Sequence, residues 1–195
     1  MSLIPASFSS FLKRRETVYP ANGDPASVDD PTTWTSFDNA LAAHKPGGFD
    51  GIGCVLTSNR GIVGFDLDNC VSDGGGIDTW AASIVERLDT YCEISPSGHG
   101  LRLLAYGELP PKGRHAGAFE CYSSKRYLTF TGDVRGNVKP LAEQQETIDQ
   151  IHREQFPKVY PLASRMKSNT RSPIMMHVTL VFAWVTVGMM EASAI

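Results

Sequence analysis

Two aspartates, Asp66 and Asp68, stand two residues apart in the run Gly64-Phe65-Asp66-Leu67-Asp68. Side chains two residues apart in a β-strand project from the same face, so the two carboxylates are expected to lie together while Phe65 and Leu67 point into the core. Neighbouring carboxylates repel each other unless a cation lies between them, and Mg²⁺ and Mn²⁺ prefer carboxylate oxygen. The pair predicts a divalent-cation site, and a solvated strand end is the plainer alternative.

A second group of residues suited to chemistry lies in the loop Ser95-Pro96-Ser97-Gly98-His99-Gly100. A serine- and glycine-rich turn between strands can expose backbone N–H groups that bind an anion, here through Ser97 and Gly98. Arg102 adds a planar guanidinium that suits phosphate oxygens, and His99 adds one more hydrogen-bonding group. A turn followed by a solvent-facing arginine explains the same residues, so this signal is weak when taken alone.

A third group follows in the run from Phe119 to Gly132. Glu120 shares a strand face with Tyr122 and becomes a third carboxylate of the site if its strand neighbours that of Asp66. Lys125 and Arg126 stand at the next turn, where they can meet a triphosphate or the backbone of a template. An ordinary charged hairpin is the alternative.

The elements that position these residues alternate between helices and strands. The sequence predicts loops with at most one short strand over residues 1–29, and then the following elements. They are a helix from Asp30-Pro31 to Pro46, a hairpin of 52–57 with 62–68, a helix over 80–91, strands at 92–95 and 101–105, a hairpin of 118–122 with 126–131, and a helix within 140–156.

This pattern favours an α+β domain with a mainly antiparallel sheet flanked by helices over a doubly wound parallel sheet. The 195 residues are enough for one domain and a tail, and a net charge of −3 excludes a strongly basic nucleic-acid coat protein. Four cysteines without a CxxC pair predict buried, reduced thiols in a cytoplasmic protein rather than a zinc finger.

In their order along the chain, these motifs resemble the primase–polymerase domain of the archaeo-eukaryotic primase superfamily, in the branch carried by phages, plasmids and integrated elements. The resemblance runs from about Val18 to Gly132 and rests on the following segments in addition to the loop at 95–100. They are Pro25-Ala26-Ser27, Asp30-Pro31-Thr32-Thr33-Trp34, Gly48-Phe49-Asp50-Gly51-Ile52-Gly53, Gly61-Ile62-Val63-Gly64-Phe65-Asp66-Leu67-Asp68 and Arg126-Tyr127-Leu128-Thr129-Phe130-Thr131-Gly132.

The resemblance implies a palm resembling an RNA-recognition motif and a template-dependent nucleotidyltransferase, a DNA primase/polymerase. By position, Asp66, Asp68 and Glu120 would hold Mg²⁺ or Mn²⁺, and the Ser97-Gly98 loop would cradle the incoming triphosphate. Many members of the family have histidine where this chain has Arg102, so either Arg102 makes the phosphate contact or nucleotide binding is altered. Two alternatives stay open: a non-catalytic nucleic-acid-binding replication module derived from such a domain, and a metal-dependent nuclease.

The predicted organisation is a lead-in at 1–17, the primase–polymerase domain at 18–139, a helix and linker at 140–172, and an apolar tail at 173–195. The apolar part of the tail is shorter than the ~20 residues of a typical membrane span, which favours a packed helix over a membrane anchor. A shifted or truncated reading frame is the third interpretation of the tail.

The expected partners are a DNA template and primer and nucleoside triphosphates. The sequence lacks GxxxxGK[ST], so the chain has no P-loop helicase of its own, and a helicase is expected either in a longer version of the protein or as a separate partner.

Overall fold

The computed structural model describes residues 9–14, 17–19, 26–45 and 51–160. These residues form three α-helices and two five-stranded sheets, and paired strands in both sheets are antiparallel. The predicted α+β class is confirmed, with two sheets where the sequence analysis expected one.

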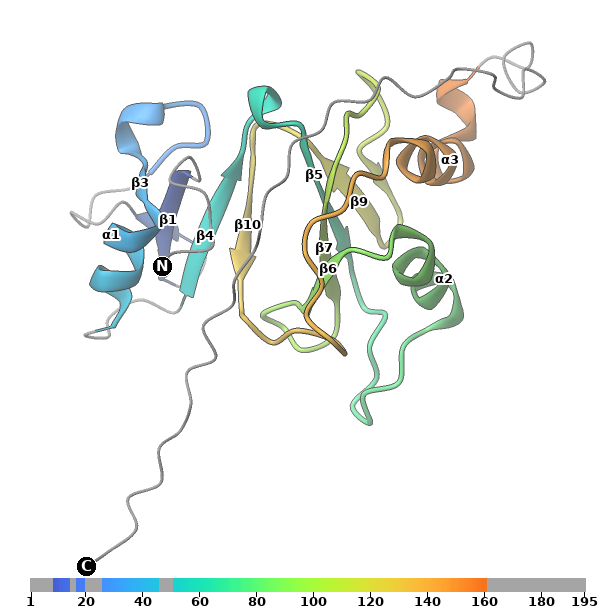
Figure 1. Ribbon diagram of the computed structural model, residues 1–195, viewed down its shortest axis with the longest axis horizontal. Helices are drawn as coiled ribbons and strands as arrows, with labels where there is room; N and C mark the ends of the chain where they lie inside the picture. The colour runs from blue at the N-terminus through green and yellow to red at the C-terminus, as the bar shows by residue number, and fades with distance from the viewer. Residues whose placement is uncertain (1–8, 15–16, 20–25, 46–50, 161–195) are drawn as a thin grey trace, which may run out of the picture.

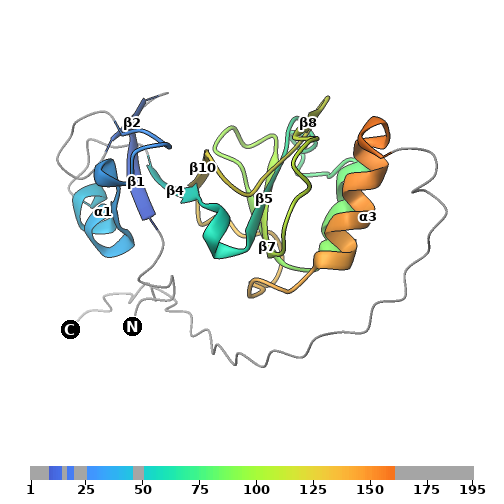
Figure 2. The same ribbon diagram turned by 90° about the horizontal axis from the view of Figure 1, so that it is seen from above.

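Sheet I joins the strands nearest the N-terminus to one strand from much later in the chain. Its order is β10-β4-β1-β2, and β3 pairs with β1 beside this path. Helix α1 covers the side of sheet I that faces away from the second sheet (Figures 1 and 2). The elements of this half are β1 (Ser9–Arg14), β2 (Thr17–Tyr19), β3 (Thr35–Ser36), α1 (Phe37–His44), β4 (Gly51–Leu56) and β10 (Arg126–Phe130).

Sheet II carries the candidate site, and its strand order is β6-β7-β5-β9-β8. Strand β5, helix α2 and strand β6 form a β-α-β unit that is split by β7, which lies between the two strands. Helices α2 and α3 cover the face of sheet II that is turned away from sheet I (Figure 2). The elements of this half are β5 (Ile62–Leu67), α2 (Thr79–Leu88), β6 (Tyr91–Ile94), β7 (Leu101–Tyr106), β8 (His115–Ala116), β9 (Phe119–Tyr122) and α3 (Gln145–Gln155).

Two apolar clusters, one on each face of sheet II, hold this sheet against its neighbours. Phe65 and Leu67 are 1% and 0% exposed and pack between sheet II and its helices, as the alternation of β5 predicted. A smaller cluster, which includes Leu56, Leu104 and Leu128, joins sheet II to sheet I. In Figure 2, α1 lies at one end of the molecule, the strands of sheet I follow with β10 nearest to sheet II, and α3 lies at the other end.

Both predicted hairpins are wrong in their pairing, although their strands exist. β4 pairs with β10 and β5 pairs with β9, so each turn carries the chain from one sheet to the other. The first crossing passes through a short 3-10 helix at Ser58–Arg60 and the left-handed residue Gly61, and the second passes through Lys125, which is also left-handed. The two predicted turns are therefore present, but the strands on either side of each turn pair with other strands and not with each other.

Three further predictions need correction. Residues 9–19 contain two strands, β1 and β2, where at most one was expected, and β1 lies within the predicted lead-in. The helix predicted from Asp30 is a 3-10 turn at Pro31–Thr33, and α1 begins only after the hydroxyl of Ser36 accepts a hydrogen bond from the Asn39 N–H. The helix predicted to reach residue 91 ends at Leu88.

The helix expected within 140–156 is present as α3. The four cysteines are free and buried, as predicted. The tail at 173–195 and the linker after residue 160 lie outside the described residues, so the proposed domain boundaries stay predictions. Within the described part of the chain, none of the helices combines the length and the apolar character that crossing a bilayer requires.

Candidate active site

A row of charged side chains crosses sheet II from one edge to the other. The register places Glu93 of β6 opposite Arg102 of β7, Arg102 opposite Asp66 of β5, Asp66 opposite Glu120 of β9, and Glu120 opposite His115 of β8. Residues opposite each other on neighbouring strands share a face, so all five side chains belong to the face turned toward sheet I. Glu120 was expected to join Asp66 only if their strands were neighbours, and β9 does pair with β5.

Strand β10 passes over this row and contacts it at successive strands. The guanidinium of Arg126 donates to Glu120 of β9 (Nη2 to Oε2, 2.9 Å), and the carbonyl of Thr129 accepts from Arg102 of β7 (Nη1, 2.8 Å). Just after β10, the backbone N–H groups at 131 and 132 donate to Glu93 of β6 at 3.1 and 3.2 Å. The edge strand of sheet I thus holds the charged row along most of its length.

Asp66 lies at the centre of the row and is 8% exposed. Both of its carboxylate oxygens lie 3.4 Å from nitrogens of Arg102, one from Nε and one from Nη2. A buried carboxylate requires such a partner because water cannot solvate it. Arg102 therefore neutralises Asp66 and ties it to sheet I through Thr129.

Asp68 follows β5 directly and is exposed. Its backbone N–H donates to the carbonyl of Ala118 at 2.8 Å, which continues the β5–β9 pairing one residue beyond the strands. Partial burial raises the pKa of the Asp68 carboxyl, and the negative charges of Asp66 and Glu120 raise it further. The three predicted carboxylates are therefore close enough to repel one another.

Glu120 has two basic neighbours. In addition to the ion pair with Arg126, its Oε1 lies 3.8 Å from Nε2 of His115, and its side chain is 16% exposed. The Arg126 guanidinium also lies over the ring of Tyr122, 4.6 Å from its centroid. These contacts join the start of β10 to the outer strands of sheet II.

The Ser97-Gly98-His99 loop connects β6 to β7 at the end of sheet II where β5 finishes. Its N–H groups donate inside the loop: Gly98 to the carbonyl of Ser95, His99 to Oγ of Ser97, and Gly100 to Oγ of Ser95. A phosphate at this loop would meet exposed side chains or would replace these internal bonds.

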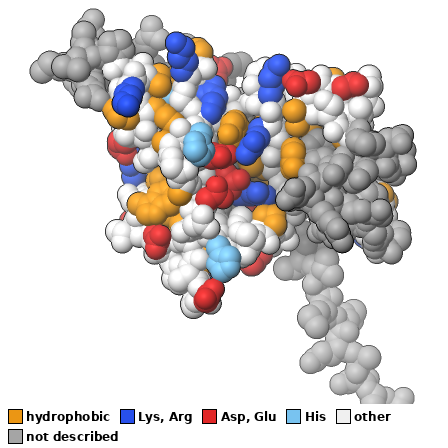
Figure 3. All heavy atoms as spheres, turned by 180° about the vertical axis from the view of Figure 1, so that it is seen from behind, with side chains coloured by type: hydrophobic (Ala, Val, Ile, Leu, Met, Phe, Trp, Pro, Cys, Tyr) orange, Lys and Arg blue, Asp and Glu red, His pale blue; other side chains and the backbone are white. Residues whose placement is uncertain are grey.

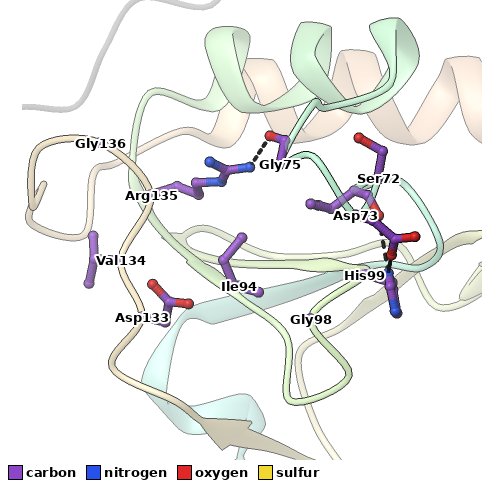
Figure 4. Close-up of a pocket in the computed structure, with 11 residues that line it drawn as sticks. Ser72, Asp73, Gly75, Ile94, Gly98, His99, Asp133, Val134, Arg135 and Gly136 are labelled. Carbon is purple, nitrogen blue, oxygen red and sulfur yellow. Dashed lines mark hydrogen bonds and ion pairs between the residues drawn. The ribbon is translucent and has the colours of Figure 1, made fainter.

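His99 is turned toward the neighbouring loop at 71–76 rather than toward Asp66. Its Nδ1 lies 3.4 Å from the carbonyl of Val71 and 3.8 Å from Oδ1 of Asp73. Together with Gly98 it lines a pocket of about 510 Å³, which Figure 4 shows between the two loops and the segment 133–136.

Lys125 is separated from the carboxylates as well. Its ammonium group lies 3.1 Å from Oδ1 of Asp29, an exposed residue of the N-terminal half. Of the nine predicted site residues, four come together with charged contacts, and Asp68 lies close enough to feel the charges of those four. The four are Asp66, Arg102, Glu120 and Arg126.

Two members of the row, Glu93 and His115, were missed by the sequence analysis. Glu93 is 1% exposed, and its carboxylate also accepts a hydrogen bond of 2.6 Å from the Tyr91 hydroxyl. Closing the predicted strands at 92–95 and 101–105 around the loop at 96–100 would place Ile94 across from Arg102, whereas the structure pairs Ile94 with Leu101 and Glu93 with Arg102. His115 lies on a two-residue strand that no pattern marks.

The donor set of Asp66, Asp68 and Glu120 fits a divalent cation in its chemistry, because such a cation prefers carboxylate oxygen and Asp66 and Glu120 lie opposite each other with Asp68 directly after β5. They are not yet gathered as ligands: among the described residues no group of three or more His, Cys, Asp or Glu is arranged to hold a metal ion. Arginine nitrogens lie beside the carboxylate oxygens of Asp66 and Glu120. Figure 3 shows a molecular face on which acidic side chains gather, with lysine and arginine side chains around them.

The chain belongs to the phage-type primase–polymerase family, as its ordered motifs predicted, although no family model matches it. The supporting relative is the DNA Primase-polymerase of Nitratiruptor phage NrS-1, which is 37% identical over 149 residues. This match covers 70% of the chain and 21% of the relative. The chain thus matches about a fifth of the length of this curated relative.

Proposed function

We propose that this chain is the nucleotidyl-transfer domain of a DNA primase/polymerase that acts in the replication of a phage, plasmid or integrated element. Its substrates would be nucleoside triphosphates and a DNA template with its primer. The observation that carries the proposal is that Asp66 and Glu120 lie opposite each other on β5 and β9, with Asp68 directly after β5, in a chain related to a DNA Primase-polymerase.

Asp66, Asp68 and Glu120 would hold Mg²⁺ or Mn²⁺. When bound, such cations stabilise the attacking and leaving oxygens of a phosphoryl transfer. The protein's own part is mainly to position groups, because this chemistry needs little covalent help from side chains. Buried Asp66 provides a fixed point, and exposed Asp68 faces the solvent from which a nucleotide arrives.

The remaining predicted site residues would contact phosphate. Arg102 lies beside the predicted carboxylates, and its ion pair with Asp66 fixes its guanidinium. Ser97, Gly98 and His99 form an exposed loop at the same end of the sheet. Lys125 and Arg126 are exposed at the crossing between the sheets, where the backbone of a template would find positive charge. A separate helicase and a cytoplasmic location stay predictions.

The decisive test is primer extension by the full chain with Mn²⁺ and deoxynucleoside or ribonucleoside triphosphates. Asp66→Asn and Asp68→Asn should each reduce extension by about a hundredfold or more, because each removes a charge that the transition state requires. Glu86→Gln, on the exposed side of α2, is the matched control and should extend primers normally. Absence of extension by the wild type, or equal extension by all variants, would refute the proposal. Degradation of labelled DNA without nucleotides would instead identify a nuclease.

A non-catalytic nucleic-acid-binding module is the second candidate, and one observation favours it. Arginines already neutralise Asp66 and Glu120. Such a module would bind single-stranded DNA equally well with EDTA and without nucleotides, and it would incorporate none. Fluorescence anisotropy with a labelled oligonucleotide, run beside the extension assay, separates the two candidates.

A further inference from the structure

The ion pair between Glu120 and Arg126 is held less firmly than the ion pair between Asp66 and Arg102. The Arg126 side chain is 44% exposed, and its described contacts are Glu120 and the face of the Tyr122 ring. The Arg102 side chain is 17% exposed and is fixed from two sides, by Asp66 and by the carbonyl of Thr129. Arg126 can leave its partner for water, whereas Arg102 would leave a buried carboxylate unpaired.

Arg126 also occupies the place where a cation would act on Glu120. Its Nη2 lies 2.9 Å from Oε2, so it uses lone pairs that a divalent cation would need. A guanidinium and a divalent cation cannot share one carboxylate oxygen at contact distance without strong repulsion. The two positive groups are therefore alternatives at Oε2 of Glu120.

We propose that Arg126 is an exchangeable counter-ion of Glu120, which it neutralises in the metal-free domain and releases when a divalent cation binds. This inference rests on the proposed function, because it takes Asp66, Asp68 and Glu120 as the cation site. Arg102 stays in place in both states and keeps Asp66 positioned. The exchange makes Arg126 a competitor of the metal, so its charge lowers the metal affinity of the site.

The test measures Mn²⁺ binding to the full chain, followed by the loss of the free-ion signal in electron paramagnetic resonance, without nucleotide or DNA. Arg126→Gln should bind Mn²⁺ about fivefold more tightly than the wild type, since a competing charge is gone. Arg126→Lys keeps the charge and should remain much closer to the wild type. Arg87→Gln is the matched control, because Arg87 makes its ion pair with Glu154 on the helical side of sheet II. Circular dichroism checks that each variant is folded.

The outcomes separate this inference from the proposed function. Unchanged or weaker Mn²⁺ binding by Arg126→Gln would overturn the exchange, because a competitor cannot be removed without effect. An equal gain in Arg87→Gln would also overturn it, since the effect would then follow net charge alone. If Asp66→Asn and Asp68→Asn bind Mn²⁺ as the wild type does, the cation site itself fails, and with it the metal chemistry of the proposed function.

Discussion

At the scale of single residues, Glu93 is the most buried carboxylate of the charged row, and it serves the site indirectly. It holds the chain just after β10 through two backbone N–H groups, while β10 in turn holds Arg102 through Thr129. Burial raises the pKa of the Glu93 carboxyl, and the hydrogen bonds that it accepts act in the opposite direction. Glu93 is thus a positioning residue whose burial disfavours its charged form.

Glu93→Gln should lower the free energy of unfolding by about 1–3 kcal/mol, because an NH₂ group replaces one accepting oxygen beside buried donors. The pKa of Glu93 is raised in the native state. Its contribution to the free energy of unfolding is therefore fully present below the pKa of the unfolded state, about 4.5, and declines as the pH rises through the native pKa. The stability gap between wild type and variant should therefore narrow as the pH rises from about 4.5. Urea unfolding at several pH values measures the gap. Glu86→Gln should show no such trend, and a gap that widens with pH would contradict the assignment.

The predictable and unpredictable residues of the site differ in a physical way. Asp66 and Asp68 could be predicted because strand alternation alone puts them on one face, and Glu120 needed only one strand pairing in addition. The orientation of His99 toward Asp73 and of Lys125 toward Asp29 depends on contacts between distant loops, which a local pattern does not encode.

At the scale of elements, the exchange of strand partners between the sheets is the feature that sequence patterns missed. Turn signals at 57–61 and 123–125 are equally compatible with strands that pair and with strands that diverge, since both need a reversal of the chain. The pairing of β4 with β10 and of β5 with β9 is settled by which apolar faces can be buried together. Strand positions were therefore predictable, and strand partners were not.

Gly64 lies where side chains of sheet I pack closely on sheet II, and it gives an element-scale prediction. A Cβ at Gly64 would lie 2.9 Å from Cδ1 of Leu56 and even closer to Cδ1 of Leu128. Gly64→Ala should therefore destabilise the protein by about 1–3 kcal/mol through overpacking. Adding Leu128→Ala should cost less than the sum of the two single changes, because it makes room for the methyl group.

Chemical denaturation of the single and double variants measures this coupling. Gly74→Ala is the matched control, since a Cβ there meets nothing within 4 Å, and its stability should stay within about 0.5 kcal/mol of the wild type. Strict additivity of the two changes at Gly64 and Leu128 would show that the sheets do not meet at this glycine.

At the scale of the whole molecule, the layered arrangement predicts an order of local stability. Strands β5 and β7 are paired on both sides and lie between the helices and sheet I, whereas β3 and β8 are two residues long. Amide hydrogens of Phe65 and Leu103 should exchange with solvent more slowly than those of β3 and β8, by about a hundredfold or more, because their exchange needs near-global opening. Hydrogen exchange followed by NMR measures this ranking, and comparable rates in β3 and β5 would contradict it.

The late position of β10 in the sequence has a consequence for biosynthesis. While the ribosome is still translating the first 125 residues, β4 has no partner on its β10 side, and Glu93, Arg102 and Glu120 lack the contacts that residues 126–132 supply. The nascent protein would carry an unpaired strand edge and an uncovered charged row until residues 126–132 leave the exit tunnel. Completion of the charged row is therefore among the last steps of cotranslational folding, and nascent chains stalled before β10 would be the stage most exposed to aggregation.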